Sequence, residues 1–402
     1  MEKQLDELLQ AHVVTPSETE VKDKLLAAGF VLVDEDGILY TGAAGRLDFD
    51  PLSPAYTADS ISWLASMSKL ATAVSLLQLL EQGVIGLDDD VRDTLPELAA
   101  LPVLRGQKND GTPILEAHGR VIRLRHLLTH TLGIGIDMAD PDLIQWSKTT
   151  ARRVNYMSYT LEGIKTPLRF APGEGWYYGT AYDWAGHLLT KLIRSSLSSY
   201  MQAHIFDPLG MTSTTFHPTS ISISPSASTS TPTSTLNTET QSRHLAFAYS
   251  TTDPTTGAIT LHPIPIPIPI PIPNTLTHRL RSRRLRPLLH PGRLRPRGIM
   301  MGIAAYAREM GFAPEFPPDF PLDHSLAGVL NMQDVPGKRR AGSLMWSGAT
   351  NGRWWIDRET GIAGAVFTQV EPHGNAIVVD MFDKPERMAY RCRPSGAEGG
   401  SA

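Results

Sequence analysis

The clearest pattern along the chain is a long run over residues 64–82 in which apolar residues predominate and which ends at a glycine. This run is too long for a strand and predicts a buried helix. Two shorter apolar runs at 30–33 and 38–40 are joined by an Asp-Gly turn, which favours a β-hairpin. Residues 354–357 and 363–367 predict a second hairpin near the C-terminus, on either side of a short polar turn.

Four further helices are expected, at residues 2–12, 123–131, 182–194 and 376–387. The three aspartates at 88–90 are expected to cap a short helix that follows them. Strands near both ends with helices between them indicate an α+β fold, in which one sheet is built from the two chain ends and flanked by helices. The middle would form a helical subdomain over about residues 80–215. We interpret residues 1–390 as a single domain and 391–402 as a disordered tail.

The composition excludes several classes of protein. The 402 residues carry a formal net charge of −4 and 41% apolar residues, which is ordinary for a globular protein and gives no sign of nucleic-acid binding. No apolar stretch reaches membrane-spanning length, and the charged N-terminus lacks the apolar core of a signal peptide. The single cysteine, Cys392, cannot form a disulfide framework, which fits a reducing compartment. We therefore expect a cytoplasmic protein that binds neither nucleic acid nor membrane.

Residues 218–300 differ in composition from the rest of the chain. A Ser/Thr/Pro-rich stretch at 218–242 is followed by alternating Pro and Ile at 263–273 and by eight arginines within 279–297. A composition of this kind does not bury enough apolar surface to fold by itself. Three interpretations are open: a solvated insertion, an error in the gene model, or a basic arm for nucleic acid or an anionic surface. The abrupt change in composition favours the first two.

The candidate chemistry begins with Ser66-Met67-Ser68-Lys69 at the start of the long predicted helix. On a helix Ser66 and Lys69 share a face, so the lysine amine can take the proton that a nucleophilic serine must lose. A helix N-terminus also stabilises a developing negative charge. A single Ser-x-x-Lys also occurs by chance, and a capping serine beside a surface lysine is the alternative interpretation.

Two later segments strengthen this hypothesis. Residues 173–180 place Tyr178 in a glycine-flanked loop just before a predicted helix, where a phenol can relay a proton. Residues 346–351 precede the C-terminal hairpin with small residues that let the backbone approach a substrate and offer it an N–H group. A core aromatic cluster and an ordinary turn are the alternative explanations of these two segments.

Together these segments resemble the serine β-lactamase and penicillin-binding-protein superfamily. The three motifs of that superfamily are matched in order by Ser66-x-x-Lys69, Tyr178 and Trp346-Ser347-Gly348. Residues 123–131 are also similar to a family signature between the first two motifs. The chain most resembles the fungal β-lactamase-related esterases and transesterases, which include acyltransferases that decorate polyketides such as the statins. The resemblance covers about residues 5–215 and 325–390 and implies a β-lactamase/transpeptidase-like fold with an antiparallel sheet.

The resemblance also implies a role for each matching residue. Ser66 would be the acylated nucleophile, Lys69 its partner base, and Tyr178 the group that takes the serine proton or returns one to the leaving group. The backbone N–H groups of Ser66 and Ala349 would form the oxyanion hole. Substrate would be bound by Trp346, Ser347, Gly348 and Trp176. No metal and no organic cofactor is implied.

Departures from the family pattern bear on the substrate. Penicillin-directed members carry lysine at the position of Trp346, and Thr180 stands where the second motif usually has asparagine. An indole favours apolar acyl groups and offers no charge to the carboxylate of a drug. We therefore expect a small-molecule ester or thioester, cleaved through an acyl-serine that water or an alcohol resolves, with β-lactam hydrolysis as an alternative. A Gly-rich Ser-Thr segment typical of the family has no clean counterpart within 263–305, so an inactive ligand-binding homologue is a second alternative.

Two other hydrolase classes fit the sequence poorly. His126 and His130 have the i, i+4 spacing of two metal ligands on one helix, but the stretch lacks the glutamate of a His-Glu-x-x-His motif. Capping and packing histidines are the simpler interpretation. An α/β-hydrolase requires a Gly-x-Ser-x-Gly turn around its nucleophile, and the sequence contains none.

Overall fold

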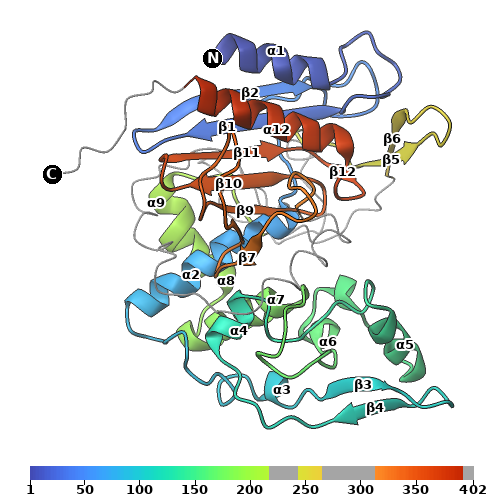
Figure 1. The fold of residues 1–402 in the computed structure, drawn as a ribbon, viewed down its shortest axis with the longest axis vertical. Coiled ribbons are helices and arrows are strands. Elements are labelled where there is room, and N and C mark those ends of the chain that lie inside the picture. Colours follow the sequence, from blue (N-terminus) through green and yellow to red (C-terminus); the bar gives the residue numbers. More distant parts are fainter. Residues whose placement is uncertain (217–242, 265–312, 393–402) are drawn as a thin grey trace, which may run out of the picture.

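The structure, a computed structural model, describes residues 1–216, 243–264 and 313–392 (Figure 1). Its centre is a seven-stranded antiparallel sheet with the strand order β2-β1-β11-β10-β9-β8-β7. The strands are β1 (Ala27–Val33), β2 (Ile38–Gly45), β7 (Leu322–His324), β8 (Val329–Asn331), β9 (Leu344–Ser347), β10 (Arg353–Asp357) and β11 (Ile362–Phe367). β1 pairs with β11, from Gly29 opposite Phe367 to Val33 opposite Ala363. The predicted sheet from both chain ends, and both predicted hairpins, are therefore confirmed.

Two helices from opposite ends of the chain cover one face of this sheet (Figure 1). Tyr40 of β2 donates a hydrogen bond to Asp6 of α1 (Glu2–His12), with 2.7 Å between the oxygens. On the same face, Trp355 of β10 lies edge-on against Phe382 of α12 (Ala376–Arg391), with ring centroids 5.5 Å apart. Asn375 caps α12 by accepting hydrogen bonds from the first N–H groups of the helix. This helix is longer than the prediction, which ended it at residue 387, and the exposed Cys392 is its C-terminal cap.

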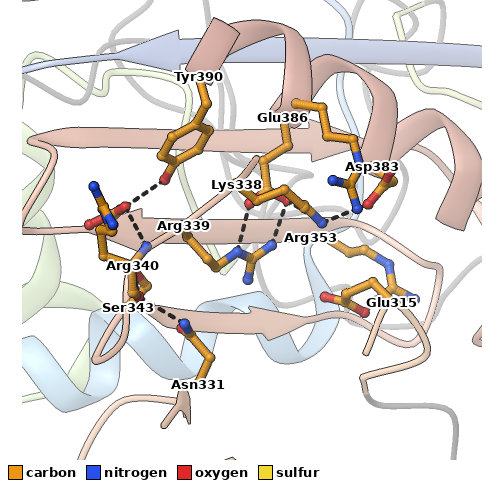
Figure 2. A network of polar contacts seen from close by, with 12 residues as sticks. Glu315, Asn331, Lys338, Arg339, Arg340, Ser343, Arg353, Asp383, Glu386 and Tyr390 are labelled. Atoms are coloured by element: carbon orange, nitrogen blue, oxygen red, sulfur yellow. Dashed lines mark hydrogen bonds and ion pairs between the residues drawn. The ribbon is translucent and has the colours of Figure 1, made fainter. Parts of the chain in front are cut away.

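A buried ion-pair network joins α12 to the loop before β9 (Figure 2). Arg339 donates two hydrogen bonds of 2.7 Å to the two carboxylate oxygens of Glu386, and both side chains are completely buried. Lys338 pairs with the same carboxylate at 2.9 Å and with Asp383 at 2.8 Å. Because every charge in this group has an opposite partner, the network can exist in the apolar interior, and it fixes α12 on the sheet.

The long predicted helix is present as a 3₁₀ turn η1 (Ala65–Ser68) that leads into α2 (Lys69–Glu81). Seven residues of α2 are buried, which confirms the prediction of a buried helix. α2 ends just before Gly83, whose φ of 71° is the left-handed conformation that glycine adopts easily after a helix. In Figure 1, α2 runs between the sheet and most of the helical part of the chain.

Over residues 96–193, the helical part of the chain lies on the far side of α2 from the sheet (Figure 1). Its elements are α3 (Pro96–Ala99), β3 (Val103–Gln107), β4 (Pro113–Glu116), α4 (Leu124–Leu128), α5 (Pro141–Thr149), the 3₁₀ turn η2 (Tyr156–Ser158), α6 (Leu161–Ile164), α7 (Ala181–Ile193), α8 (Leu197–Met201), the π-helical turn η3 (Gln202–Phe206) and α9 (Asp207–Leu209). The predicted helix at 182–194 is confirmed as α7 within one residue at each end.

Two local predictions in this region are wrong. The helix expected over 123–131 is only the five residues of α4, because His130 has a left-handed backbone with φ of 56° and the chain turns away before it. The aspartates at 88–90 do not cap a helix, since α3 begins only at Pro96. Asp88 instead forms an ion pair with Arg125 in α4.

A small second sheet uses residues from within the atypical range 218–300. β5 (Ala248–Thr252) and β6 (Ile259–Pro263) form an antiparallel hairpin, and β5 pairs in parallel with β12 (Val370–Glu371). Residues 243–264 therefore belong to the folded protein, and the atypical range is narrower than predicted. The Ser/Thr/Pro-rich stretch and the arginines lie outside the described residues. No helix in the described ranges is long and apolar enough to cross a membrane.

Candidate active site

Ser66 lies in a sharp turn at the entrance to α2. The preceding residue, Ala65, has φ of 46°, a conformation that an alanine rarely adopts. The turn is held by a 3.0 Å hydrogen bond from the N–H of Met67 to the carbonyl of Leu64 and by the buried side chain of Met67. The Ser66 side chain is half-buried. The strained turn thus directs the hydroxyl away from the helix axis and toward the loop that precedes α7.

The three predicted catalytic side chains are in direct contact. Lys69 donates a hydrogen bond from Nζ to Oγ of Ser66 at 2.9 Å. The hydroxyl of Tyr178 lies 2.6 Å from the same Oγ. The Lys69 amine is also 5.2 Å from the centre of the Tyr178 ring. The serine hydroxyl therefore has two proton-transfer groups within hydrogen-bond distance, which is the geometry that a general base and a general acid require.

The loop that carries Tyr178 is fixed against the segment after α4. The N–H of Tyr177 donates to the carbonyl of His130 at 2.9 Å, and the phenol of Tyr177 donates to Asp140. A side chain at Gly179 would overlap the carbonyl of Ile134, so only glycine permits this approach. The sequence 173–180 therefore forms a rigid support for Tyr178.

The third motif lies at the end of β9, directly against the turn of Ser66. A Cβ atom at Gly348 would overlap the carbonyl oxygen of Leu64 and lie 3.3 Å from the Cβ of Ala65. The N–H groups of Ser66 and Ala349 make no hydrogen bond within the described ranges. Two unused donors beside a nucleophilic hydroxyl are what an oxyanion hole needs.

Asn351 holds the third motif in place and was missed by the sequence analysis. Its φ is 67°, and its amide donates to the carbonyls of Val370 and Pro372 at 2.6 and 2.9 Å. Its Oδ1 accepts from the N–H groups of Gly374 and Asn375. Asparagine tolerates a left-handed turn, and this was the only local signal. A second missed contact joins Ser347 to His373, with 2.9 Å between Oγ and Nε2.

The predicted substrate-binding indoles lie in a buried aromatic cluster behind Tyr178. Trp346 is 1% exposed and its ring is 5.4 Å from that of Tyr178. Trp176 is 6% exposed and lies 5.8 Å from His324. Both indoles are thus shielded from solvent, and each packs against the ring of His130. A direct contact of either with substrate stays a prediction.

His130 is at the centre of this cluster. Its ring lies 4.8 Å from Tyr178 and 5.2 Å from His324, and neither ring nitrogen has a hydrogen-bond partner in the part of the chain that the structure describes. Burial lowers the pKa of His130 well below its usual value, and the nearby His324 and Lys69 act in the same direction. Burial also lowers the pKa of His324 to about 4. Both imidazoles are therefore neutral at pH 7 and add no positive charge beside Lys69.

The two histidines of the candidate metal pair do not face each other as ligands. His126 accepts a 3.2 Å hydrogen bond from the N–H of Arg123 and so caps α4, whereas His130 belongs to the aromatic cluster. Across residues 1–216, 243–264 and 313–392, no group of three or more His, Cys, Asp or Glu side chains is placed to hold a metal ion.

The fold and these motifs define a class of protein. The family model described as Beta-lactamase matches residues 5–382, and the chain therefore belongs to this family. The lovastatin esterase of Penicillium rubens is 30% identical over 345 residues, which cover 83% of this chain and 86% of the relative. The monacolin J acid methylbutanoyltransferase of Aspergillus terreus is 27% identical and is matched over 84% of this chain and 83% of its own length.

Solved structures of other proteins share this fold. Unliganded simvastatin synthase from Aspergillus terreus superimposes with a TM-score of 0.79 at 23% identity, over 98% of this chain and 99% of that protein. The predicted α+β fold of the β-lactamase/transpeptidase type is confirmed. The predicted enzyme class, a β-lactamase-related serine hydrolase or acyltransferase, is confirmed at the level of the family.

Proposed function

We propose that this protein transfers an acyl group from an ester or thioester through an acyl-serine intermediate on Ser66. The observation that carries the proposal is the contact of one hydroxyl with two proton-transfer groups. Oγ of Ser66 lies 2.9 Å from the Lys69 amine and 2.6 Å from the Tyr178 phenol. The same side chains match the family motifs in their order along the chain.

In the acylation step, Oγ of Ser66 forms a bond to the acyl carbon as its proton passes to Lys69 or Tyr178. The tetrahedral intermediate places a negative oxygen where the N–H groups of Ser66 and Ala349 can stabilise it. The bond from the acyl carbon to the leaving oxygen or sulfur then breaks. Tyr178 returns the proton to the leaving group, and the acyl-serine remains.

In the second step, water or an alcohol gives its proton to the same pair and attacks the acyl-serine, so Ser66 regains its proton when the ester bond breaks. The choice between hydrolysis and transesterification depends on which nucleophile reaches the intermediate. Neutral imidazoles at His130 and His324 support this chemistry, because they leave Lys69 without a competing positive charge.

The proposed substrate is a small-molecule ester or thioester of fungal secondary metabolism, and the proposed location is the cytoplasm. Two relatives, a lovastatin esterase from Penicillium and a monacolin J acid methylbutanoyltransferase from Aspergillus, support the substrate class. Trp346 in place of the lysine of penicillin-directed enzymes favours esters over β-lactams.

A fluorophosphonate probe tests the nucleophile directly. We expect stoichiometric labelling that maps to Ser66 by peptide mass spectrometry, and hydrolysis of p-nitrophenyl butyrate that is lost in Ser66→Ala. The matched control is Ser195→Ala at an exposed serine beyond α7, which should keep both labelling and turnover. Unchanged turnover in Ser66→Ala contradicts the mechanism, and a folded wild-type protein that neither labels nor turns over substrate is the inactive binding homologue.

Hydrolysis of a β-lactam is the alternative activity, and the chromogenic cephalosporin nitrocefin measures it. The ester proposal predicts kcat/KM for nitrocefin far below that for p-nitrophenyl butyrate. The reverse order would assign the protein to β-lactam hydrolysis while leaving the role of Ser66 intact.

A further inference from the structure

The two proposed oxyanion donors belong to turns that are far apart in the chain. The N–H of Ser66 lies in the turn before α2, and that of Ala349 lies in the short turn between β9 and β10. Two donors stabilise one oxyanion only when both are about 3 Å from it, so the separation of the two turns matters for catalysis. The close approach of Gly348 to Leu64 limits how near the turns can come, but a steric contact does not keep them from moving apart.

Thr350 ties the β9–β10 turn to the segment that leads into the nucleophile. It follows Ala349 directly, and its side chain is completely buried, whereas Ala349 is exposed. The hydroxyl of Thr350 donates a hydrogen bond of 3.3 Å to the carbonyl of Trp63, three residues before Ser66. The carbonyl of Thr350 accepts a 3.2 Å hydrogen bond from the N–H of Val370. One oxyanion donor is thus attached, through its neighbour in the chain, to the segment that carries the other.

The N–H group of Trp63 is held by a second buried side chain, that of Gln369. Gln369 accepts a hydrogen bond from this N–H through Oε1 and donates one from Nε2 to the carbonyl of Leu245. Because one partner is a donor and the other an acceptor, they fix the direction in which the amide points. Leu245 in turn donates from its N–H to the carbonyl of Ile61 at 3.0 Å. Both backbone groups of Trp63 are therefore bonded to buried side chains of the C-terminal part of the chain.

The position of Trp63 determines that of the nearby oxyanion donor. Only Leu64 and Ala65 separate Trp63 from Ser66, and the hydrogen bond from the N–H of Met67 to the carbonyl of Leu64 closes the turn. A turn this short leaves little freedom between its ends. A shift of Trp63 would also leave a buried N–H and a buried carbonyl without partners, which is costly. The two hydrogen bonds therefore resist displacement of the turn.

We propose that Thr350 and Gln369 are positioning residues of the oxyanion hole, which hold Trp63 so that the two N–H donors keep the separation that one oxyanion needs. This inference rests on the proposed function. The role is distinct from proton transfer, which the amine and the phenol beside the nucleophile carry out. Loss of either side chain should therefore weaken the stabilisation of the tetrahedral intermediate selectively.

A change of one atom in the substrate isolates the oxyanion hole. In the thionoester analogue of p-nitrophenyl butyrate, sulfur replaces the carbonyl oxygen, so attack by Ser66 places the negative charge on sulfur. Sulfur is a weaker hydrogen-bond acceptor than oxygen, and donors spaced for oxygen stabilise it less. Both substrates release p-nitrophenolate, and kcat/KM reports the acylation step for each. A displaced nucleophile or base slows both substrates, whereas a displaced oxyanion donor lowers the ratio of kcat/KM for ester to thionoester.

Thr350→Val removes the hydroxyl with little change of shape and should lower this ratio about tenfold, which is less than the effect of losing a whole oxyanion donor. Thr350→Ser keeps the hydroxyl and should largely preserve the ratio. Gln369→Met removes both side-chain hydrogen bonds at similar volume and should lower the ratio as Thr350→Val does. Each rate is divided by the fraction of Ser66 that a fluorophosphonate labels, so that a loss of folded protein is not counted as a loss of catalysis.

Thr368→Val is the matched control. Thr368 is also buried, and its hydroxyl donates a hydrogen bond of 3.2 Å to the carbonyl of Ala27 in β1, away from the turn of Ser66. The substitution removes the same kind of bond one residue before Gln369. It should lower the free energy of unfolding in urea by about as much as Thr350→Val does and leave the ratio unchanged.

Inhibition by propylboronic acid gives a second measurement for the case that the wild type does not cleave the thionoester. This acid forms a tetrahedral adduct on the nucleophilic serine and resembles the intermediate of butyrate transfer, so it binds through the same donors. Its inhibition constant should rise about tenfold in Thr350→Val and in Gln369→Met and stay unchanged in Thr368→Val.

The possible results separate the positioning role from the proposed function. An unchanged ratio in a folded Thr350→Val or Gln369→Met overturns the role of that residue, and an equal fall in Thr368→Val overturns both roles; the acyl-serine mechanism then still stands. If Thr350→Val and Gln369→Met fail to fold while Thr368→Val folds, the two residues are structural and the inference is overturned. Absence of any turnover that depends on Ser66 in the wild type overturns the proposed function instead.

Discussion

Gly348 and Leu64 lie so close together that a side chain at residue 348 would overlap the carbonyl oxygen of residue 64. This contact joins the third motif to the turn that presents Ser66. Gly348→Ala must therefore push β9 away from the nucleophile. Because small displacements of reacting groups are costly, we expect kcat/KM for p-nitrophenyl butyrate to fall on the order of a hundredfold.

Gly119→Ala is the matched control for this substitution, because a Cβ atom there meets no atom within 4 Å and the backbone is not left-handed. It should change neither activity nor melting temperature measurably. Wild-type kinetics in Gly348→Ala would mean that the third motif has no part in the site.

The second prediction concerns the two groups in contact with Ser66. Lys69→Ala and Tyr178→Phe should each lower kcat by about a hundredfold or more, as expected for a lost proton-transfer group. The double variant should be little worse than the worse single variant, because groups that act as a unit have non-additive effects. Stopped-flow or steady-state kinetics of all three variants provide the measurement, and effects that simply multiply would show that the two groups act separately.

Acid should destabilise the fold through its buried histidines. Burial lowers the pKa of His324 from 6.5 to about 4, so below pH 6.5 the unfolded chain takes up a proton that the folded protein does not. The stability contributed by the neutral ring is thus complete above pH 6.5 and lost as the pH falls toward 4. Between pH 7.5 and 5 this one residue should account for a loss of about 2 kcal/mol.

Urea unfolding of the wild type and His324→Asn at several pH values measures this loss. The side-chain amide of asparagine can replace the donor that His324 offers to the carbonyl of Ser325. The two pH dependences should be parallel above pH 7 and diverge below 6.5, with the variant the less sensitive. Parallel curves down to pH 5 would exclude His324 as a source of acid lability.

The buried pair of Arg339 and Glu386 should tolerate loss of one partner poorly. Glu386→Gln leaves the guanidinium without its countercharge in the interior, and we expect it to cost about 3–5 kcal/mol of unfolding free energy. Lys384→Gln on the same helix is the control, because its pair with Asp380 is about half exposed and should contribute less than about 1 kcal/mol. A loss in Glu386→Gln no larger than in the control would show that the network does not hold α12 on the sheet.

The sequence alone predicted the sheet, the two hairpins and the long buried helix, because apolar runs and glycine-containing turns are local signals. It also placed Ser66, Lys69 and Tyr178 in one site, since three motifs in a fixed order carry more information than any one. Backbone conformation was not predictable in the same way. The side chains of Ala65 and His130 give no sign that their backbones are left-handed. The helix over 123–131 was therefore predicted too long.

Contacts between residues that are far apart in the chain were also not predictable from the sequence. Arg339 and Glu386 are far apart in the chain, and nothing in the local sequence of either points to the other. The burial of Trp346 beside Tyr178 depends on contacts between β9 and the loop before α7, and could not be predicted from the Trp-Ser-Gly motif.

The pairing of β1 with β11 has a consequence for the newly made chain. Ser66, Lys69 and Tyr178 are synthesised long before Ala349, so a nascent polypeptide has its nucleophile but only one of the two proposed oxyanion donors. A growing chain that has not reached β11 also leaves one edge of β1 without its pairing strand. We therefore expect a growing chain to gain acyl-transfer activity only after the segment from β9 to β11 has been added.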